Sequence, residues 1–245
     1  MDRRNLNQNV DILVFGAHPD DIELSCSGTI LKHIDLGYKI GLIDLTRGEL
    51  GTRGSKKIRD QESKIATSLM NVSYRINLNM KDGLFNINDD NKLKIISSIR
   101  SAKPRIVIVN SVNDRHPDHG RAAELIKTCC FLAGLEKITT KSNNIIQDTW
   151  RPEQLFYYIQ YNQIIPDIII DTSNYFDKKM EIIKSYSSQF YNPKSKDTKT
   201  IISEKSFLES IEYRSKDLGR IINVKHAEGF KSERILSVNN LFDLN

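Results

Sequence analysis

The amino-acid sequence predicts an α/β fold with a Rossmann-like, mostly parallel sheet flanked by helices. Two continuous apolar runs, residues 10–17 and 104–111, are typical of strands buried on both faces of a sheet. Segments with helical spacing of apolar residues follow these runs, and such alternation indicates right-handed βαβ units. No internal repeat or long low-complexity linker divides the chain. We therefore expect residues 1–245 to form a single α/β domain with a C-terminal extension.

The first half of the chain alternates regularly between the two kinds of element. The residue pattern predicts strands at 10–17, 38–46, 74–80 and 104–111, and helices at 23–37, 56–70, 91–102 and 120–134. Gly37 suits the end of the first helix, because glycine readily adopts the left-handed backbone found there. A glycine-rich loop, residues 47–55, joins the second strand to the second helix.

The second half of the chain is less regular. Its pattern predicts strands at 154–161 and 166–173 and helices at 175–190 and 206–220. Residues 225–236 close the chain without an assigned element, and we place the C-terminal extension at this end.

The composition limits the classes of partner. Hydrophobic residues make up 39% of the chain and charged residues 27%, which is ordinary for a globular protein. The net charge is +5, but the lysines are scattered, and their densest cluster at 192–199 lacks interleaved aromatic residues. We expect a small anionic substrate and no nucleic acid. No apolar run approaches the roughly 18 residues of a membrane span, and the N-terminus lacks a signal-peptide pattern, so we expect a cytoplasmic protein without a membrane partner.

Two clusters of histidine and aspartate follow buried strands at the point where each strand ends. The first is Ala-His-Pro-Asp-Asp at residues 17–21, and the second is His-Pro-Asp-His at residues 116–119. In a doubly wound sheet, ligands bind beyond the carboxyl ends of the strands, where the strand order reverses. If the two strands are neighbours at that point, we expect the two clusters to meet in one crevice.

The residue types in these clusters suit a divalent metal. Imidazole and carboxylate groups form catalytic zinc sites, in which three protein ligands leave a fourth position open. His18 and Asp21 lie three residues apart on a turn that leads into a helix, so they can bind one ion together with a histidine of the second cluster. Zinc lowers the pKa of a bound water to about 7 and polarises a carbonyl oxygen. Asp20 would remain free to act as a general base.

Other interpretations fit parts of this pattern. Taken alone, each cluster is also compatible with a polar turn that caps the following helix. Two histidines and one carboxylate also form the iron(II) site of many oxygenases, so Fe²⁺ is an alternative to Zn²⁺, although such an enzyme needs no general base beside the ligands. A non-enzymatic nucleotide-binding module is a third alternative, but the first strand ends without the Gly-x-Gly-x-x-Gly pattern that holds a pyrophosphate.

Longer stretches of the sequence resemble the PIG-L or LmbE-like family of zinc-dependent deacetylases. The similar stretches are FGAHPDDIEL, DLTRGELGTRG, DRHPDHGRAAELI, YSSQF and HAEGF, and they look like the branch that deacetylates N-acetyl-glucosaminyl L-malate in bacillithiol biosynthesis. The resemblance implies a hydrolase that removes the N-acetyl group from that conjugate. Free N-acetylglucosamine, a chitin disaccharide and an inositol conjugate are alternative substrates. The resemblance also implies a homo-oligomer.

The family motifs assign roles to individual residues of this chain. By resemblance, His18, Asp21 and His119 are the ligands of one zinc ion per chain, and Asp20 is the general base. His116 supports the oxyanion or protonates the leaving amine.

The resemblance extends to four further residues around the expected site. Asp118 is placed to orient a histidine, as carboxylates around metal sites do. Arg59 looks like a clamp for a substrate carboxylate, and Arg115 is a second candidate for that task. His226 stands where relatives commonly have a tyrosine that is thought to reach the substrate or the oxyanion. A histidine can donate the same hydrogen bond, but it titrates near pH 6.5 and can also bind metal.

Overall fold

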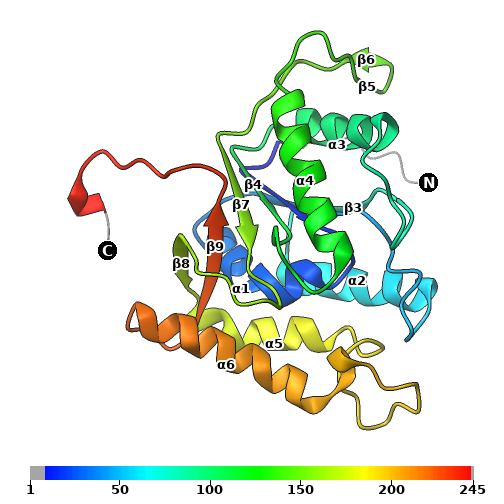
Figure 1. Ribbon diagram of the computed structural model, residues 1–245, viewed down its shortest axis with the longest axis vertical. Coiled ribbons are helices and arrows are strands. Elements are labelled where there is room, and N and C mark those ends of the chain that lie inside the picture. Colours follow the sequence, from blue (N-terminus) through cyan, green and yellow to red (C-terminus); the bar gives the residue numbers. More distant parts are fainter. Residues whose placement is uncertain (1–8, 244–245) are drawn as a thin grey trace.

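A seven-stranded sheet lies at the centre of the structure, a computed structural model that describes residues 9–243 (Figure 1). The strands run in the order β3-β2-β1-β4-β7-β9-β8. They are β1 (Ile12–Gly16), β2 (Ile40–Asp44), β3 (Tyr74–Asn77), β4 (Ile106–Val109), β7 (Gln154–Tyr158), β8 (Ile168–Asp171) and β9 (Ala227–Ser232), and a separate hairpin holds β5 (Lys141–Ser142) and β6 (Ile145–Ile146). The sheet is parallel from β3 to β7, which confirms the expected mostly parallel α/β fold.

The strand order reverses between β1 and β4. Ile12 of β1 pairs with Ile40 of β2 on one side and with Ile106 of β4 on the other, in both cases in parallel. From β1 the chain proceeds outward to β2 and β3, whereas β7 lies on the opposite side of β4. The two strands that precede the histidine clusters are therefore neighbours at the reversal point, as the predicted crevice requires.

Helices cover both faces of the sheet (Figure 1). They are α1 (Asp21–Asp35), α2 (Lys56–Met70), α3 (Asp89–Ala102), α4 (Pro117–Leu132), α5 (Phe176–Lys184) and α6 (Lys205–Ile221). Successive side chains of a strand point to opposite faces, so Leu13 and Phe15 join the core formed with α3 and α4, while Ile12 and Val14 join the core formed with α1, α2, α5 and α6. Within residues 9–243, none of the helices is long and apolar enough to cross a bilayer.

Residues 225–236, to which we assigned no element, contribute β9 between β7 and β8. This strand runs antiparallel to both neighbours. Its buried Glu228 accepts hydrogen bonds from the backbone N–H groups of Gly28 and Thr29 in α1 at 3.0 and 2.7 Å, and it pairs with Lys179 of α5 at 2.5 Å. Buried charge of this kind breaks the apolar alternation, which is why the pattern did not reveal the strand.

The helix expected at 175–190 is shorter in the structure, because α5 ends at Lys184. Phe190 is still almost completely buried, so the apolar spacing continues beyond the helix. Glu62 of α2 accepts hydrogen bonds from the backbone N–H and the hydroxyl of Ser188, both at 2.7 Å. The Glu62 carboxylate thus replaces a helical carbonyl as the acceptor for the N–H of Ser188, and the helix does not continue there.

Candidate metal centre and adjoining cavity

The two histidine clusters lie on the turns that connect β1 to α1 and β4 to α4. Ala17, directly after β1, donates its backbone N–H to Oδ1 of Asn110, directly after β4, at 2.8 Å. This hydrogen bond ties the two strand ends together. Asp21 is the first residue of α1, and His116 is the residue before Pro117 at the start of α4. Both clusters therefore stand where the chain leaves the sheet for a helix.

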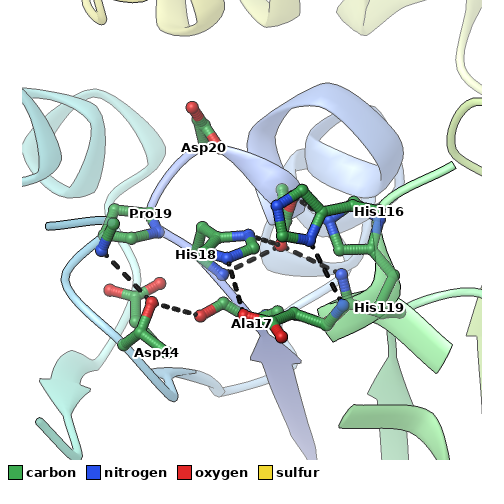
Figure 2. A network of polar contacts seen from close by, with 12 residues as sticks. Ala17, His18, Pro19, Asp20, Asp44, His116 and His119 are labelled. Atoms are coloured by element: carbon green, nitrogen blue, oxygen red, sulfur yellow. Dashed lines mark hydrogen bonds and ion pairs between the residues drawn. The ribbon is translucent and has the colours of Figure 1, made fainter. Parts of the chain in front are cut away.

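Three of the five histidines meet at this point, and Figure 2 shows their rings facing one another. The ring centroids of His18 and His116 are 4.6 Å apart, those of His18 and His119 5.6 Å, and those of His116 and His119 5.2 Å. His18 and His119 are buried, whereas His116 is partly exposed. The expected meeting of the two clusters is thus present in the fold.

Asp21 lies between two of these rings. Its Oδ2 is 3.4 Å from Nδ1 of His18, and its Oδ1 is 3.1 Å from Nε2 of His119. Asn110 and Gln160 also donate side-chain N–H groups to this carboxylate, at 3.0 and 2.7 Å. Burial alone would raise the pKa of Asp21, but the two imidazoles hold it well below its ordinary value. Asp21 is therefore a buried carboxylate that stays ionised.

The outer nitrogen of each of these two histidines faces a further carboxylate. Nδ1 of His119 lies 2.8 Å from Oδ2 of Asp114. Nε2 of His18 lies 3.0 Å from Oδ1 of Asp82 and 3.3 Å from Oδ2 of Asp118. A carboxylate beside one ring nitrogen favours the proton on that nitrogen and leaves the other nitrogen with a free lone pair. A metal that displaces the inner protons would therefore bind Nδ1 of His18 and Nε2 of His119, while the outer nitrogens stay hydrogen-bonded to carboxylates.

His116 forms a compact group with the other two histidines, with ligand atoms within 4.8 Å of one another. However, its Nδ1 accepts the backbone N–H of Asp118 at 3.2 Å. Burial lowers the pKa of His116, and the neighbouring His18 and His119 lower it further, so the ring is neutral. A neutral ring whose Nδ1 accepts a hydrogen bond carries its proton on Nε2. In this arrangement Nε2 of His116 carries a proton that it can donate to a ligand in the cavity.

A second compact group contains His18, Asp82 and Asp118. Both of these carboxylates already accept backbone hydrogen bonds at 2.8 Å, Asp82 from Leu50 and Asp118 from Gly83. Both carboxylates lie against the outer nitrogen of His18. Carboxylates in that position commonly orient a histidine that binds a metal. This geometry suits the support of His18, and the role expected for Asp118 stays a prediction.

The cluster of His18, Asp21 and His119 suits a divalent cation. Burial would lower the pKa of His119, but the carboxylates of Asp21 and Asp114 raise it to about 9. The pKa of His18 is likewise raised well above its ordinary value by the three carboxylates around it, against the effect of burial. The surrounding carboxylates thus favour the protonated, positively charged form of both rings. A divalent cation would take the place of these two added protons. Two imidazoles and a carboxylate fit Zn²⁺ and also accept Fe²⁺.

Asp20 and Arg59 form a buried ion pair beside the cluster. Nη2 of Arg59 donates to Oδ2 of Asp20 and to the carbonyl of Pro19, each at 2.6 Å, and Nη1 donates to the carbonyl of Gly48 at 3.3 Å. Gly48 has a φ of +63°, and a Cβ there would overlap the guanidinium, so this position needs glycine. In this structure the guanidinium of Arg59, which we expected to bind a substrate carboxylate, pairs with Asp20, and its buried Nε has no hydrogen-bond partner among residues 9–243.

Asp20 and Asp21 are adjacent but have different surroundings. Asp20 has a φ of +116°, a backbone conformation that residues other than glycine rarely adopt. In this conformation its carboxyl points away from the three histidine rings (Figure 2). It lines the cavity next to Arg59. Burial raises the pKa of Asp20 to about 7, although the charge of Arg59 opposes this shift. A pKa in this range suits a general base at neutral pH.

A cavity of about 460 Å³ opens over the cluster, which is an ordinary size for a small-molecule site. Polar residues that line it include His18, Asp20, Asp21, Arg59, Arg115, His116 and His119, and apolar ones include Leu24, Leu50 and Phe207. Arg115 is exposed, and its guanidinium lies 5.0 Å from the ring centroid of Tyr161. Asp118 is fully buried and acts on the site through His18.

His226 lies outside this cavity, which corrects its expected contact with the substrate. It is buried, and its ring stacks on Phe176 with centroids 3.9 Å apart. Its Nδ1 lies 2.8 Å from the hydroxyl of Ser215. These two partners hold the ring between α5, α6 and β9, so His226 is a packing residue.

Four polar residues of the site were absent from our sequence-based assignment: Asn110, Asp82, Asp114 and Gln160. Asn110 and Asp114 carried a usable signal, because both stand beside the second histidine cluster after an apolar strand. Asp82 and Gln160 lie on loops after β3 and β7, and their contacts with His18 and Asp21 depend on the tertiary fold.

The fold and the cluster together define the class: an α/β protein with a candidate His-Asp-His metal centre at the point where a doubly wound sheet reverses. Residues 13–130 match the PIG-L family, described as GlcNAc-PI de-N-acetylase. The chain therefore contains a PIG-L family domain.

Similar proteins include deacetylases and a structure of the same fold. An uncharacterized deacetylase, YaiS of Escherichia coli (strain K12), is 31% identical over 119 residues, which cover 46% of this chain and 64% of that protein. A probable N-acetyl-alpha-D-glucosaminyl L-malate deacetylase 2 of Bacillus anthracis is 25% identical over 198 residues, 73% of this chain and 81% of the relative. The crystal structure of the conserved protein TT1542 from Thermus thermophilus superposes with a TM-score of 0.83 at 30% identity and covers 94% of this chain and 98% of that chain.

Proposed function

We propose that the protein is a metal-dependent deacetylase that removes the N-acetyl group from an N-acetylglucosamine conjugate, specifically N-acetyl-glucosaminyl L-malate. The observation that carries the proposal is the convergence of His18 Nδ1 and His119 Nε2 on the carboxylate of Asp21, with Asp20 in the wall of the same cavity. The PIG-L match and the relatives named deacetylases support the reaction class. One relative is named for the malate conjugate, and the net charge of +5 suits such an anion.

His18, Asp21 and His119 would hold one Zn²⁺, which supplies a Lewis acid for the acetyl carbonyl and for a water molecule. The chain itself keeps these ligands in place. Asp114 faces the outer nitrogen of His119, and Asp118 faces that of His18, so the inner nitrogens of both rings would be the ones that bind the metal.

Asp20 is placed to accept a proton from the attacking water. Arg59 holds this carboxylate at 2.6 Å, which fixes its direction and favours its ionised form. His116 donates Nε2–H to the acetyl oxygen as negative charge develops there, because its Nδ1 is occupied by the backbone of Asp118. The proton on Asp20 then passes to the departing amine, and acetate and the free amine leave.

The test is the release of free amine from a panel of conjugates by zinc-loaded and chelator-treated protein. The panel contains N-acetyl-glucosaminyl L-malate, its inositol analogue, N,N'-diacetylchitobiose and methyl N-acetylglucosaminide. We expect release from the malate conjugate above all, loss of release after chelation and recovery with added zinc. Absence of release from every conjugate, with either Zn²⁺ or Fe²⁺, would contradict the proposal.

We also propose that the chain works as a cytoplasmic homo-oligomer on a small anionic sugar conjugate, without a nucleic-acid or membrane partner. The scattered lysines and the resemblance described above support this proposal. Light scattering of the purified protein tests the subunit number, and a monomer at micromolar concentration would contradict it.

A further inference from the structure

Four arginines line the cavity, and they differ in what their guanidinium groups already bind: Arg53, Arg59, Arg115 and Arg214. Arg53 donates to the backbone carbonyls of Ser188 and Thr198 at 2.9 and 3.0 Å and to the hydroxyl of Ser195 at 2.9 Å. Arg59 is paired with Asp20. Both guanidinium groups therefore already bind protein acceptors, although Nε of Arg59 has no partner among residues 9–243.

Arg214, on α6, has no comparable partner. Its one side-chain hydrogen bond within residues 9–243 is long and runs from Nη2 to the carbonyl of Leu24 at 3.5 Å. None of the ion pairs of the described residues involves it, although its neighbours on α6 are paired. Burial lowers the pKa of Arg214, and the charges of Asp114 and Glu228 only partly oppose this shift.

A guanidinium that is partly removed from water without a counter-charge is energetically unfavourable, and an anionic ligand would offset this cost. Arginine binds a carboxylate through two parallel hydrogen bonds, which gives orientation as well as affinity. Arg115 lines the same cavity, and within the described part of the chain its guanidinium contacts the ring of Tyr161 and forms no ion pair. Among residues 9–243, the cavity thus offers two guanidinium groups without an ion pair, one from the loop before α4 and one from α6. Malate has two carboxylates.

We propose that Arg214 binds a carboxylate of the substrate and makes the site selective for N-acetylglucosamine conjugates with an acidic aglycone. This inference rests on the proposed function and names the residue that selects its substrate class. Arg115 is the second cation of the pair. Arg59, which the sequence suggested for this task, holds Asp20 instead.

The test compares N-acetyl-glucosaminyl L-malate with methyl N-acetylglucosaminide, which carries the same sugar without a carboxylate. Arg214→Met keeps most of the length of the side chain and removes the charge. We expect the ratio of kcat/KM for the malate conjugate to that for the methyl glycoside to fall about ten- to a hundredfold, as a charge-assisted hydrogen bond is lost. Arg214→Lys should recover part of the ratio. An equal fall for both substrates, or an unchanged ratio, would overturn the proposal.

Arg220→Met is the matched control, because Arg220 lies on the same helix, is exposed and pairs with Asp217. It should leave the ratio unchanged.

Binding of L-malate alone separates this proposal from the proposed reaction. Calorimetry on the wild-type protein and on Arg214→Met should show at least about tenfold weaker binding in the variant. If the wild-type protein deacetylates neither sugar, the proposed function fails, and the malate measurement still decides the role of Arg214. Equal malate affinity of the two proteins would overturn that role.

Discussion

Nη2 of Arg59 lies 2.6 Å from Oδ2 of Asp20, and each side chain is only 6% exposed. Such a buried pair is strongly coupled, because removal of one partner leaves the other charge without compensation. Burial already raises the pKa of Asp20 to about 7, and the charge of Arg59 is the main opposing influence. Arg59 therefore acts on the reaction through the ionisation and direction of Asp20, whichever substrate is bound.

Arg59→Met should lower kcat by at least about tenfold on every substrate of the deacetylase. Without the guanidinium the pKa of Asp20 rises further, and each unit above the assay pH reduces the ionised fraction about tenfold. Initial rates on the malate conjugate and on methyl N-acetylglucosaminide should fall by similar factors. A rise in KM confined to the malate conjugate would instead return Arg59 to the role of a substrate clamp.

Asp20→Asn should retain one zinc per chain and lose on the order of a hundredfold or more in turnover. The amide has nearly the same shape but cannot accept a proton, and general-base removal usually has this magnitude. Zinc content by elemental analysis and kcat are measured on the same preparation. His119→Ala is the comparison, since it should lose the zinc as well. Loss of zinc from Asp20→Asn would show that Asp20 is itself a ligand.

Asp114→Asn should weaken zinc binding by about ten- to a hundredfold, because its carboxylate orients the ring of His119 and raises its basicity. Competition with a chromophoric chelator measures the affinity. Asp217→Asn serves as the control, since Asp217 is exposed and pairs only with Arg220 on α6. Unchanged affinity of Asp114→Asn would remove Asp114 from the support of the metal site.

Six of the seven strands of the central sheet and the two histidine clusters were predictable because local patterns encode them. Each cluster follows an apolar run, and parallel strands bring their carboxyl ends to one edge. Asp82 was not predictable, because it stands in a loop well beyond the end of β3 and reaches His18 only in the folded chain. His226 was expected in the site because histidine suits its chemistry. Its ring instead contacts Ser215 and Phe176, outside the cavity.

The buried pair of Lys179 and Glu228 connects α5 to β9, the strand that the pattern did not reveal. Glu228 also accepts the backbone N–H groups of Gly28 and Thr29, so partners from two helices, α1 and α5, fix its charge in place. Lys179→Met would leave this carboxylate buried without a counter-charge. We expect a loss of about 3–5 kcal/mol in the free energy of unfolding, measured with urea.

The double variant Lys179→Met with Glu228→Gln separates the charge from the packing. Glutamine keeps a carbonyl oxygen that can accept one of the two backbone hydrogen bonds and carries no charge to leave uncompensated. We therefore expect the double variant to be more stable than Lys179→Met alone, although it carries one more substitution. The free energies of unfolding lost in Lys179→Met and in Glu228→Gln are also measured singly. If the double variant lost their sum, the two residues would act independently. The buried ion pair would then not be what holds β9 against α1 and α5.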